Sequence, residues 1–554
     1  MEKPAARART ISWFAGAIAA TLWLAGIAGT PLKAMAQAAP PAPEAPKMTK
    51  DEFEQGKTIY FQRCAGCHGT LRAGATGPEL SPGKTIKLGG ERIKDVLQYG
   101  MLGGMPAWGE DGVLSEQEIE IVSRYIQQEP PAPPELPLEE IKKSWKVYVP
   151  LEQRPKKVAH KRNWENFFGV VLRDKGEVAI IDGDTKERLA VIKTGYAVHI
   201  LRSSSSGRYF YVVGRDGRIS LIDLWPAEPT LVAEVKPCID ARSVDASKYH
   251  GPKGDFSDKL AIVGCYWPPH FAILDGLTLE PKKLVRTSGY TYDTNEYLPE
   301  VRVASIIASH FDPLWVVSMK ESGYVWLVDY SDIKNLRVSM IEAERFLHDG
   351  GWDATKRYFL VAANMRNRMS VIDVKEKKFI ANIDTGKKPH PGRGANWVDP
   401  EFGPVYGTTH IGEGQLTLIG TDPARHKKYA WKVVRQFELK GRAGGLFIKT
   451  HDKSPWVWTD APLNAEAEKT QTLCVYSKKK AQIEKCFAAA DHGRLVHFEY
   501  NRNGDEVWVS VWDKTGEILV YDDKTLALKT KITGDWLVTP TGKFNVFNTQ
   551  NDVY

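Results

Sequence analysis

This 554-residue sequence lacks a large net charge and, beyond residue 29, a long apolar run. The formal net charge is only +7, from 75 basic and 68 acidic residues, and such a mild excess does not indicate binding to nucleic acid. Beyond residue 29, no apolar run is long enough to cross a membrane. Hydrophobic residues make up 42% of the chain, enough for sizeable cores, and the length predicts one small and one large domain.

The first 36 residues have the three parts of a secretory signal. Basic side chains come first, an apolar run spans residues 11–29, and Ala34-Met35-Ala36 forms an A-x-A cleavage site. An uncleaved membrane anchor is the alternative, because the run is almost long enough to span a bilayer. We therefore predict a signal peptide over residues 1–36 and export to a bacterial periplasm.

One motif, Cys64-Ala65-Gly66-Cys67-His68, predicts covalent attachment of a c-type haem. Each thiol can add to a haem vinyl group, and the two-residue spacer sets the separation of the two sulfur atoms. His68 is then placed as an axial ligand of the iron. A CxxC redox pair, or a chance match, is the alternative interpretation.

The residues around this motif have the pattern of a small helical domain over residues 48–129. Helical periodicity covers residues 50–62, 91–99 and 115–128, and Ser115 with Glu118 could form a capping box. The Gly/Pro-rich loop before the last helix carries Met105, which we predict as the sixth iron ligand, and Trp108, which can pack on the porphyrin. Met101 is the alternative ligand, and a methionine with only a core role is another possibility.

Pro-rich segments mark the limits of this domain. Residues 37–47 predict a flexible arm, and residues 130–143, which begin with PPAPPELP, predict a semi-rigid linker. The large domain then covers residues 144–554.

The large domain contains short β-branched runs that each close on an aspartate or a turn. The eight runs are residues 179–182, 221–223, 273–275, 327–329, 371–373, 418–420, 475–477 and 520–522. Their spacing is about 40–55 residues, the length of a four-stranded propeller blade. The expected fold is therefore a small all-α cytochrome c domain followed by an all-β eight-bladed propeller, with a seven-bladed ring as the alternative. We expect Trp145 to Val149 to close the ring with the C-terminal blade.

A propeller axis is a good seat for a cofactor, because loops from every blade converge there. Three histidines, His199, His310 and His348, lie beside apparent strands and are candidates for ligands or catalysts, although each alone is more often structural. Convergent arginines would suit a cofactor with several carboxylates, and those near blade edges are Arg173, Arg202, Arg215, Arg242 and Arg393.

Two cysteines flank a predicted hairpin around residues 477–480. A disulfide between Cys474 and Cys486 is geometrically possible there. A pair of buried free thiols fits the sequence equally well.

Several long segments together resemble the cytochrome cd1 nitrite reductases. They are IYFQRCAGCHG, GGMPAWG, TGYAVHI, IIASH, FLHDGGWD, PHPGRGAN and the ending TPTGKFNVFNTQNDVY. The resemblance runs from about residue 48 to the last residue. It implies a periplasmic enzyme, usually a homodimer, that reduces nitrite to nitric oxide. A small soluble donor, either a c-type cytochrome or a cupredoxin, would supply single electrons.

The resemblance also implies two cofactors and their residues. Cys64 and Cys67 would hold a covalent haem c, with His68 and Met105 as its axial ligands. His199 would be the proximal ligand of a non-covalent haem d1. The two catalytic histidines on the distal side would be His310 and His348. Further contacts to haem d1 are implied for Arg173, Arg202, Arg215, Arg242, Tyr266, Arg393, Thr541 and Gly542.

This chain departs from the family pattern at two places. The arm has no tyrosine, which some members use as a distal ligand of haem d1, and His497 stands where the family often has glutamine. Three other functions remain open: a protein that oxidises or delivers a haem d1 precursor, an electron carrier whose propeller only docks partners, and a quinone-dependent dehydrogenase. His310 and the FLHDGGWD segment favour the reductase.

Overall fold

The computed structural model describes residues 44–74, 77–101, 105–132, 134–547 and 553. The predicted signal and most of the predicted arm lie outside the described residues. Within the described residues, no helix is both long enough and apolar enough to span a membrane.

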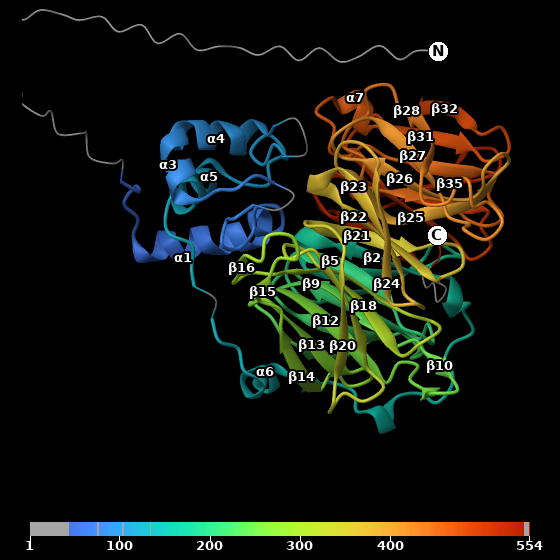
Figure 1. The fold of residues 1–554 in the computed structure, drawn as a ribbon, viewed down its shortest axis with the longest axis horizontal. Helices are drawn as coiled ribbons and strands as arrows, with labels where there is room; N and C mark the ends of the chain where they lie inside the picture. The colour runs from blue at the N-terminus through green and yellow to red at the C-terminus, as the bar shows by residue number, and fades with distance from the viewer. Residues whose placement is uncertain (1–43, 75–76, 102–104, 133, 548–552, 554) are drawn as a thin grey trace, which may run out of the picture. The chain divides into compact units, whose positions relative to one another are not determined.

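A small helical domain comes first and is coloured blue in Figure 1. Its elements are α1 (Lys50–Ile59), a π-helical turn (Tyr60–Cys64), α2 (Ala65–His68), α3 (Pro82–Leu88), α4 (Gly90–Tyr99) and α5 (Glu116–Tyr125). The capping box predicted at Ser115 and Glu118 is present at the start of α5. Helix α3 was not predicted, because its seven residues are too short to show a clear apolar period.

The linker after this domain ends in a helix, α6 (Leu138–Ser144). Ile141 on α6 is 1% exposed and packs into the core of the second blade of the propeller. The last part of the predicted linker is therefore folded onto the propeller and is not a free spacer.

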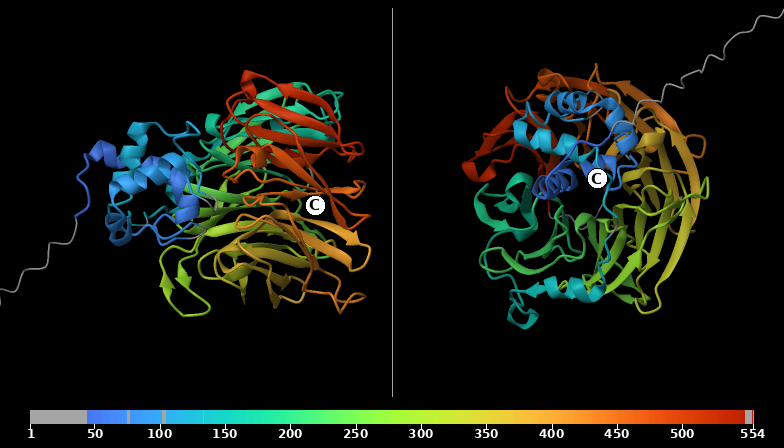
Figure 2. Two further views of the ribbon diagram at one scale, coloured as in Figure 1. Left: turned by 90° about the horizontal axis from the view of Figure 1, so that it is seen from above. Right: turned by 90° about the vertical axis from the view of Figure 1, so that its left-hand side faces the viewer.

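Eight antiparallel sheets follow in the described residues, and they surround a central axis (Figure 2, right). From the inner to the outer strand, the first four blades are β37 (Lys543–Phe547), β2 (Phe167–Leu172), β3 (Glu177–Asp182), β4 (Arg188–Lys193); β5 (Val198–Ser203), β6 (Tyr209–Gly214), β7 (Ile219–Asp223), β8 (Thr230–Val235); β9 (Asp240–Ala246), β12 (Leu260–Trp267), β13 (His270–Asp275), β14 (Pro281–Arg286); β17 (Val303–Ala308), β18 (Leu314–Met319), β19 (Tyr324–Asp329), β20 (Arg337–Glu342).

The other four blades continue the same order. They are β21 (Leu347–Trp352), β22 (Tyr358–Ala363), β23 (Arg368–Asp373), β24 (Lys378–Asp384); β25 (Pro389–Asp399), β26 (Gly403–His410), β27 (Gln415–Gly420), β28 (Val433–Glu438); β29 (Ile448–Lys449), β30 (Trp456–Thr459), β31 (Thr472–Ser477), β32 (Gln482–Ala488); β33 (Arg494–Tyr500), β34 (Glu506–Trp512), β35 (Glu517–Asp522), β36 (Leu528–Thr533). Two small hairpins, β10 (His250–Gly251) with β11 (Gly254–Asp255) and β15 (Gly289–Tyr290) with β16 (Tyr297–Leu298), and a short helix, α7 (Ala467–Thr470), lie outside the blades.

The eight β-branched runs seen in the sequence are the third strands of the eight blades, so the eight-bladed prediction is confirmed. A third strand lies inside its sheet and is covered on both faces, which makes it a nearly continuous apolar run. The closing aspartates make the following turn. Asp182, for example, accepts hydrogen bonds from the backbone N–H groups of Asp184 and Thr185.

Ring closure differs from the prediction. Strand β37 near the C-terminus pairs with β2 and completes the first blade. The segment expected to do this forms β1 (Lys146–Val147), which instead pairs with β8 as a fifth, outer strand of the second blade. The assignment was wrong because the sequence of a short strand does not show which sheet edge it will join.

Two disulfides are present in the propeller. Cys474 and Cys486 lie directly opposite each other on β31 and β32 and are bonded, so the possible disulfide is confirmed. A second disulfide joins Cys238, in the loop before β9, to Cys265 on β12. It was not predicted, because strand β9 and the β10–β11 hairpin separate these residues in the sequence.

The contact between the first and last blades gives a test of ring closure. Phe168 on β2 stacks on Trp508 on β34, with ring centroids 3.9 Å apart, and both side chains are fully buried. Phe168→Ala should lower the free energy of unfolding by about 3–5 kcal/mol, since a large cavity would form between the blades. Phe379→Ala on β24, where the ring is 39% exposed, should change it by less than about 1 kcal/mol. Equal losses in urea unfolding of the two variants would contradict this interpretation.

Candidate functional site

The haem-attachment motif lies where the π-helical turn passes into α2. Cys64 ends the π-helical turn and is buried, and burial raises the pKa of its thiol to about 12. Cys67 is exposed, and neither cysteine forms a disulfide. Both cysteines are therefore free thiols, and a free thiol is the form that adds to a haem vinyl group. A π-helical segment is rare and occurs often at functional sites.

The ring of His68 is fixed by two features. Its Nδ1 lies 2.8 Å from the carbonyl oxygen of Pro78 and donates to it, which leaves Nε2 free to bind a metal. The face of the ring lies against Gly77, where a Cβ would come within 2.7–3.0 Å of the imidazole atoms. Burial lowers the pKa of His68, so the ring is neutral, as an iron ligand must be.

The two candidate methionines differ in burial. Met105 is half-buried and packs on the core of the helical domain, which also contains Trp108 at 6% exposure. Met101 is 55% exposed, and its N–H donates to the Met105 carbonyl at 3.0 Å. The position of Met105 beside the core that surrounds Cys64 favours Met105 as the ligand.

A pocket opens on the axis of the propeller, and each of the eight inner strands contributes to its wall. The side chains that matter to its chemistry are His199 and Arg202 from β5, Arg242 and Ser243 from β9, Asp349 from β21, Arg393 from β25, Lys449 from β29, His497 and Glu499 from β33 and Phe544 from β37. Four basic groups face two acidic ones, so the wall favours a ligand that carries negative charge.

Three buried polar atoms on this wall have no hydrogen-bond partner among the described residues. They are Arg393 Nη1, Ser243 Oγ and His497 Nδ1. Buried polar groups in native proteins are nearly always paired. These groups therefore fit a bound molecule with oxygen atoms around its edge, such as a macrocycle with several carboxylates.

His199 and His497 both lie where their inner strand is irregular. The pairing of β5 with β6 shifts register between Val198 and Ile200, and that of β33 with β34 shifts between Val496 and Phe498. Such bulges redirect one side chain and are common beside active sites. At both positions the redirected side chain is a histidine that lines the pocket.

Asp349, which lines another part of the pocket, lies between two histidines that are not themselves lining residues. His348 Nδ1 is 3.2 Å from Asp349 Oδ1, and His390 Nε2 is 3.0 Å from Asp349 Oδ2. The two imidazole rings are 5.1 Å apart. Burial opposes ionisation of Asp349, but the two histidines outweigh it and hold the pKa of this carboxyl well below its ordinary value.

The two histidines differ in their surroundings. His390 Nδ1 lies 2.8 Å from the Leu446 carbonyl oxygen, and its Nε2 faces the carboxylate of Asp349. Both ring nitrogens of His390 therefore face acceptor oxygens. Burial lowers the pKa of His348 to about 3, which makes its ring neutral.

His310 is not brought to this pocket. It lies in the turn after β17, while the pocket is lined by Ala304, Ser305 and Ile306 on that strand. Four residues of extended strand separate His310 from Ile306, roughly 13 Å. The histidine that joins His348 around Asp349 is His390. Sequence analysis missed His390, although it precedes Arg393 in the PHPGRGAN segment.

The remaining predicted contacts lie next to the haem-attachment motif and not among the residues that line the pocket. Arg173 Nη2 donates to the Gln62 carbonyl at 3.1 Å, and Gly542 lies against the Arg173 side chain. Arg215 makes two hydrogen bonds of 2.6 Å to Asp240.

Thr541 and Tyr266 also lie in this region beside the haem-attachment motif. Thr541 donates to Asp174, which also pairs with Arg63 at 2.8 Å. The ring of Tyr266 is fully buried beneath the guanidinium groups of Arg215 and Arg302.

A haem-attachment motif in a helical domain and a basic pocket on a propeller axis together define a two-centre haem protein. The family model for the cytochrome D1 heme domain matches residues 162–549, and the model for cbb3-type cytochrome c oxidase subunit III matches residues 51–126. The chain belongs to the cytochrome d1 haem domain family, and its cofactors are haem c and haem d1.

Known proteins cover nearly the whole chain. The nitrite reductase of Stutzerimonas stutzeri is 50% identical over an alignment of 566 positions, gaps included, that covers 96% of this chain and 99% of that protein. The dihydro-heme d1 dehydrogenase of Pseudomonas aeruginosa is 27% identical over 495 residues, or 89% of this chain and 94% of that protein. A solved structure of the dihydro-heme d1 dehydrogenase NirN in complex with DHE has a TM-score of 0.67 and 26% identity, covering 89% of this chain and 99% of that one.

The low pKa of His348 predicts a dependence of stability on pH in the protein without haem d1. Between pH 6.5 and 3 the unfolded chain holds a proton on His348 that the folded chain does not, so folding loses stability as the pH falls. The free energy of unfolding should therefore fall relative to His348→Gln by about 2 kcal/mol between pH 7 and pH 5.

A second histidine provides the control. The pKa of His492 is raised, chiefly by a hydrogen bond to Asp491, so its contribution to stability is lost as the pH rises. The difference between wild type and His492→Gln should move in the opposite direction over the same range. Urea unfolding at pH 5, 6 and 7 measures both, and the same sign for the two variants would count against the assignment.

Proposed function

We propose that this chain is a periplasmic nitrite reductase that forms nitric oxide and water. The 50% identity to a nitrite reductase over almost the full length supports this proposal. The observation that carries it is the His348–Asp349–His390 cluster, in which two imidazoles contact a carboxylate that lines the pocket.

The chemistry explains why such a cluster is needed. Nitrite takes up one electron and two protons and loses one oxygen as water, because oxide is too poor a leaving group. Haem d1, when bound, supplies the iron site and the electron. His390 is the proposed proton donor, and the Asp349 carboxylate, 3.0 Å from its Nε2, orients the imidazole. His348 is a neutral N–H group that can orient the substrate or pass on the second proton.

The residues around the two cofactors take the following proposed roles. Cys64 and Cys67 hold haem c covalently, with His68 and Met105 as axial ligands. His199 is the proximal ligand of haem d1. Arg202, Arg242 and Arg393 pair with its carboxylates, because guanidinium groups bind carboxylates in a bidentate way. Arg173, Arg215, Tyr266, Thr541 and Gly542 connect this pocket to the helical domain.

The cellular setting is proposed on separate grounds. The two disulfides fit an oxidising compartment such as the periplasm, to which a cleaved signal at residues 1–36 would direct the chain. The homodimer and a small soluble donor, a c-type cytochrome or a cupredoxin, are proposed from the resemblance to the family.

A second function has one specific observation in its favour. The likeness to dihydro-heme d1 dehydrogenase covers 89% of this chain in sequence and in structure. That function would need haem d1 as product and not as resident cofactor. Purified holoprotein should show a chlorin-like band in the red, which haem c alone does not give, and should turn over nitrite with a reduced donor. A protein with the red band that forms no nitric oxide would instead favour the second function.

The histidine cluster makes a direct prediction for catalysis. His348→Ala and His390→Ala should each lower nitrite turnover by about 10²–10⁴-fold, since each removes a proton-holding group at the reacting oxygen. The absorption spectrum of haem c should not change in either variant.

His310→Ala is the matched control, because it removes the same side chain from the end of β17 that is turned away from the pocket residues. Its turnover should stay close to that of the wild type. If His310→Ala were as damaging as His348→Ala, the assignment of the cluster would be refuted.

A further inference from the structure

The propeller holds the haem-attachment segment through buried charged side chains. Arg302, which is fully buried just before β17, donates from Nη1 to the carbonyl oxygen of Ala65 at 2.7 Å. Glu300 accepts hydrogen bonds from the backbone N–H groups of Thr70 and Leu71, at 2.7 and 2.6 Å. Two side chains of one propeller loop therefore hold the backbone on both sides of Cys67 and His68.

A third charged residue fixes Arg302 in turn. The Arg302 Nε and backbone N–H both donate to the carboxylate of Glu321, each at 2.7 Å. Glu300 and Glu321 are each 7% exposed, and Glu300 lies 3.7 Å from the guanidinium. Burial opposes the charge on Arg302, but the two carboxylates outweigh it and raise the pKa of the guanidinium. We call Glu300, Arg302 and Glu321 the buried clamp.

A close contact between Gly66 of the motif and Arg215 of the propeller also fixes the position of the motif. A Cβ at Gly66 would lie 2.9 Å from Nη1 of Arg215. Arg215 cannot swing aside freely, because its Nε and Nη2 both donate to Asp240, each at 2.6 Å. A side chain at position 66 would therefore collide with Arg215, and glycine allows this close approach.

We propose that Glu300 and Arg302 are positioning residues for electron transfer. The buried clamp holds the haem-attachment segment on the propeller in one pose, so that an electron passes between the two centres without a movement of the helical domain. Removing one member of a buried, hydrogen-bonded ion pair is far more disruptive than removing an exposed one. Pre-organised geometry of this kind keeps the distance between reacting centres constant.

This inference rests on the proposed function only for the destination of the electron. The contacts of the buried clamp belong to the chain itself and can be measured separately. Hydrogen exchange at the amides of Thr70 and Leu71 reports on Glu300 directly, because these two N–H groups donate to its carboxylate.

Glu300→Gln in the holoenzyme is the main test, since it keeps the shape but removes the charge and one of the two acceptors. We expect exchange at Thr70 and Leu71 to become about tenfold faster or more. The rate at which flash-reduced haem c passes its electron to haem d1 should fall about tenfold and become slower in glycerol, since the productive pose would be populated only part of the time. The wild-type rate should not depend on viscosity.

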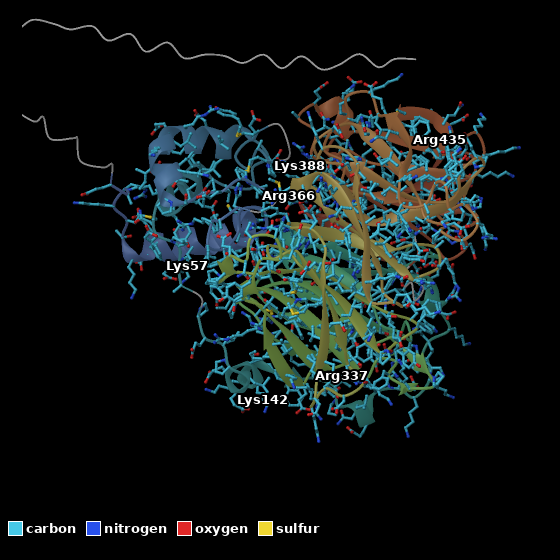
Figure 3. All side chains as sticks on the ribbon, in the orientation of Figure 1. Lys57, Lys142, Arg337, Arg366, Lys388 and Arg435 are labelled. Carbon is cyan, nitrogen blue, oxygen red and sulfur yellow. A yellow bond between two sulfur atoms is a disulfide. The ribbon has the colours of Figure 1, made fainter. Side chains whose placement is uncertain are left out.

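Arg302→Lys is the second variant, because it keeps the positive charge and loses the forked geometry. Arg302→Lys should show the same changes in exchange and in transfer rate. If this variant does not fold, the result for Glu300→Gln alone decides the test. The control is Arg337→Gln, which breaks an exposed pair with Asp329 at 3.1 Å (Arg337 is labelled in Figure 3) and should change neither exchange nor the transfer rate.

The outcomes separate clearly. Faster exchange with an unchanged transfer rate would show that the buried clamp is only structural and would overturn the proposal, as would a viscosity-dependent rate in the wild type. Unchanged exchange would show that the contacts themselves do not exist in solution. A wild type that transfers electrons as expected but forms no nitric oxide would refute the proposed function and leave the buried clamp standing.

Discussion

The pairing of β37 with β2 is the interaction on which the rest of this structure depends. It joins the last strand of the chain to the first blade and so turns eight sheets into a closed ring. Closing a ring removes the free sheet edges that an open array would leave. It also places Phe544 in the wall of the axial pocket and Thr541 beside Asp174, so both the pocket and the contact with the haem-attachment segment need this strand.

The two cofactor sites use charge in different ways. In the axial pocket, buried atoms of Arg393, Ser243 and His497 have no hydrogen-bond partner among the described residues, an arrangement that is costly until a ligand satisfies it. At the junction with the helical domain, two buried arginines already have carboxylate partners: Arg215 pairs with Asp240 and Arg302 with Glu321. The arrangement in the pocket suits a bound molecule. The arrangement at the junction holds the helical domain on the propeller.

What the sequence could predict depended on the type of strand. Third strands are buried on both faces and form continuous apolar runs, so the number of blades could be counted from them. Inner strands carry polar residues and bulges that turn individual side chains, so their sequences do not reveal which residues face the axis. This is why His310 was paired with His348, and why His390 was overlooked although it is on the next inner strand.

Other features depended on contacts between distant segments. The capping box at Ser115 and Glu118 and the bond between Cys474 and Cys486 are local; the sequence predicted the first and left the second open between a disulfide and two free thiols. The bond from Cys238 to Cys265 and the closing role of β37 involve partners that only the folded ring brings together. The arginines were predicted as one group, but only the structure divides them between the pocket and the junction.

The order of the chain has a consequence for how the protein is made. Cys64 and Cys67 emerge early in synthesis and need only the local helical turns, so a haem can be attached while most of the propeller is still absent. The axial pocket uses all eight inner strands, including β37, which contains Phe544. The second cofactor must therefore enter a finished ring, and its delivery is a late step of maturation that translation alone cannot complete.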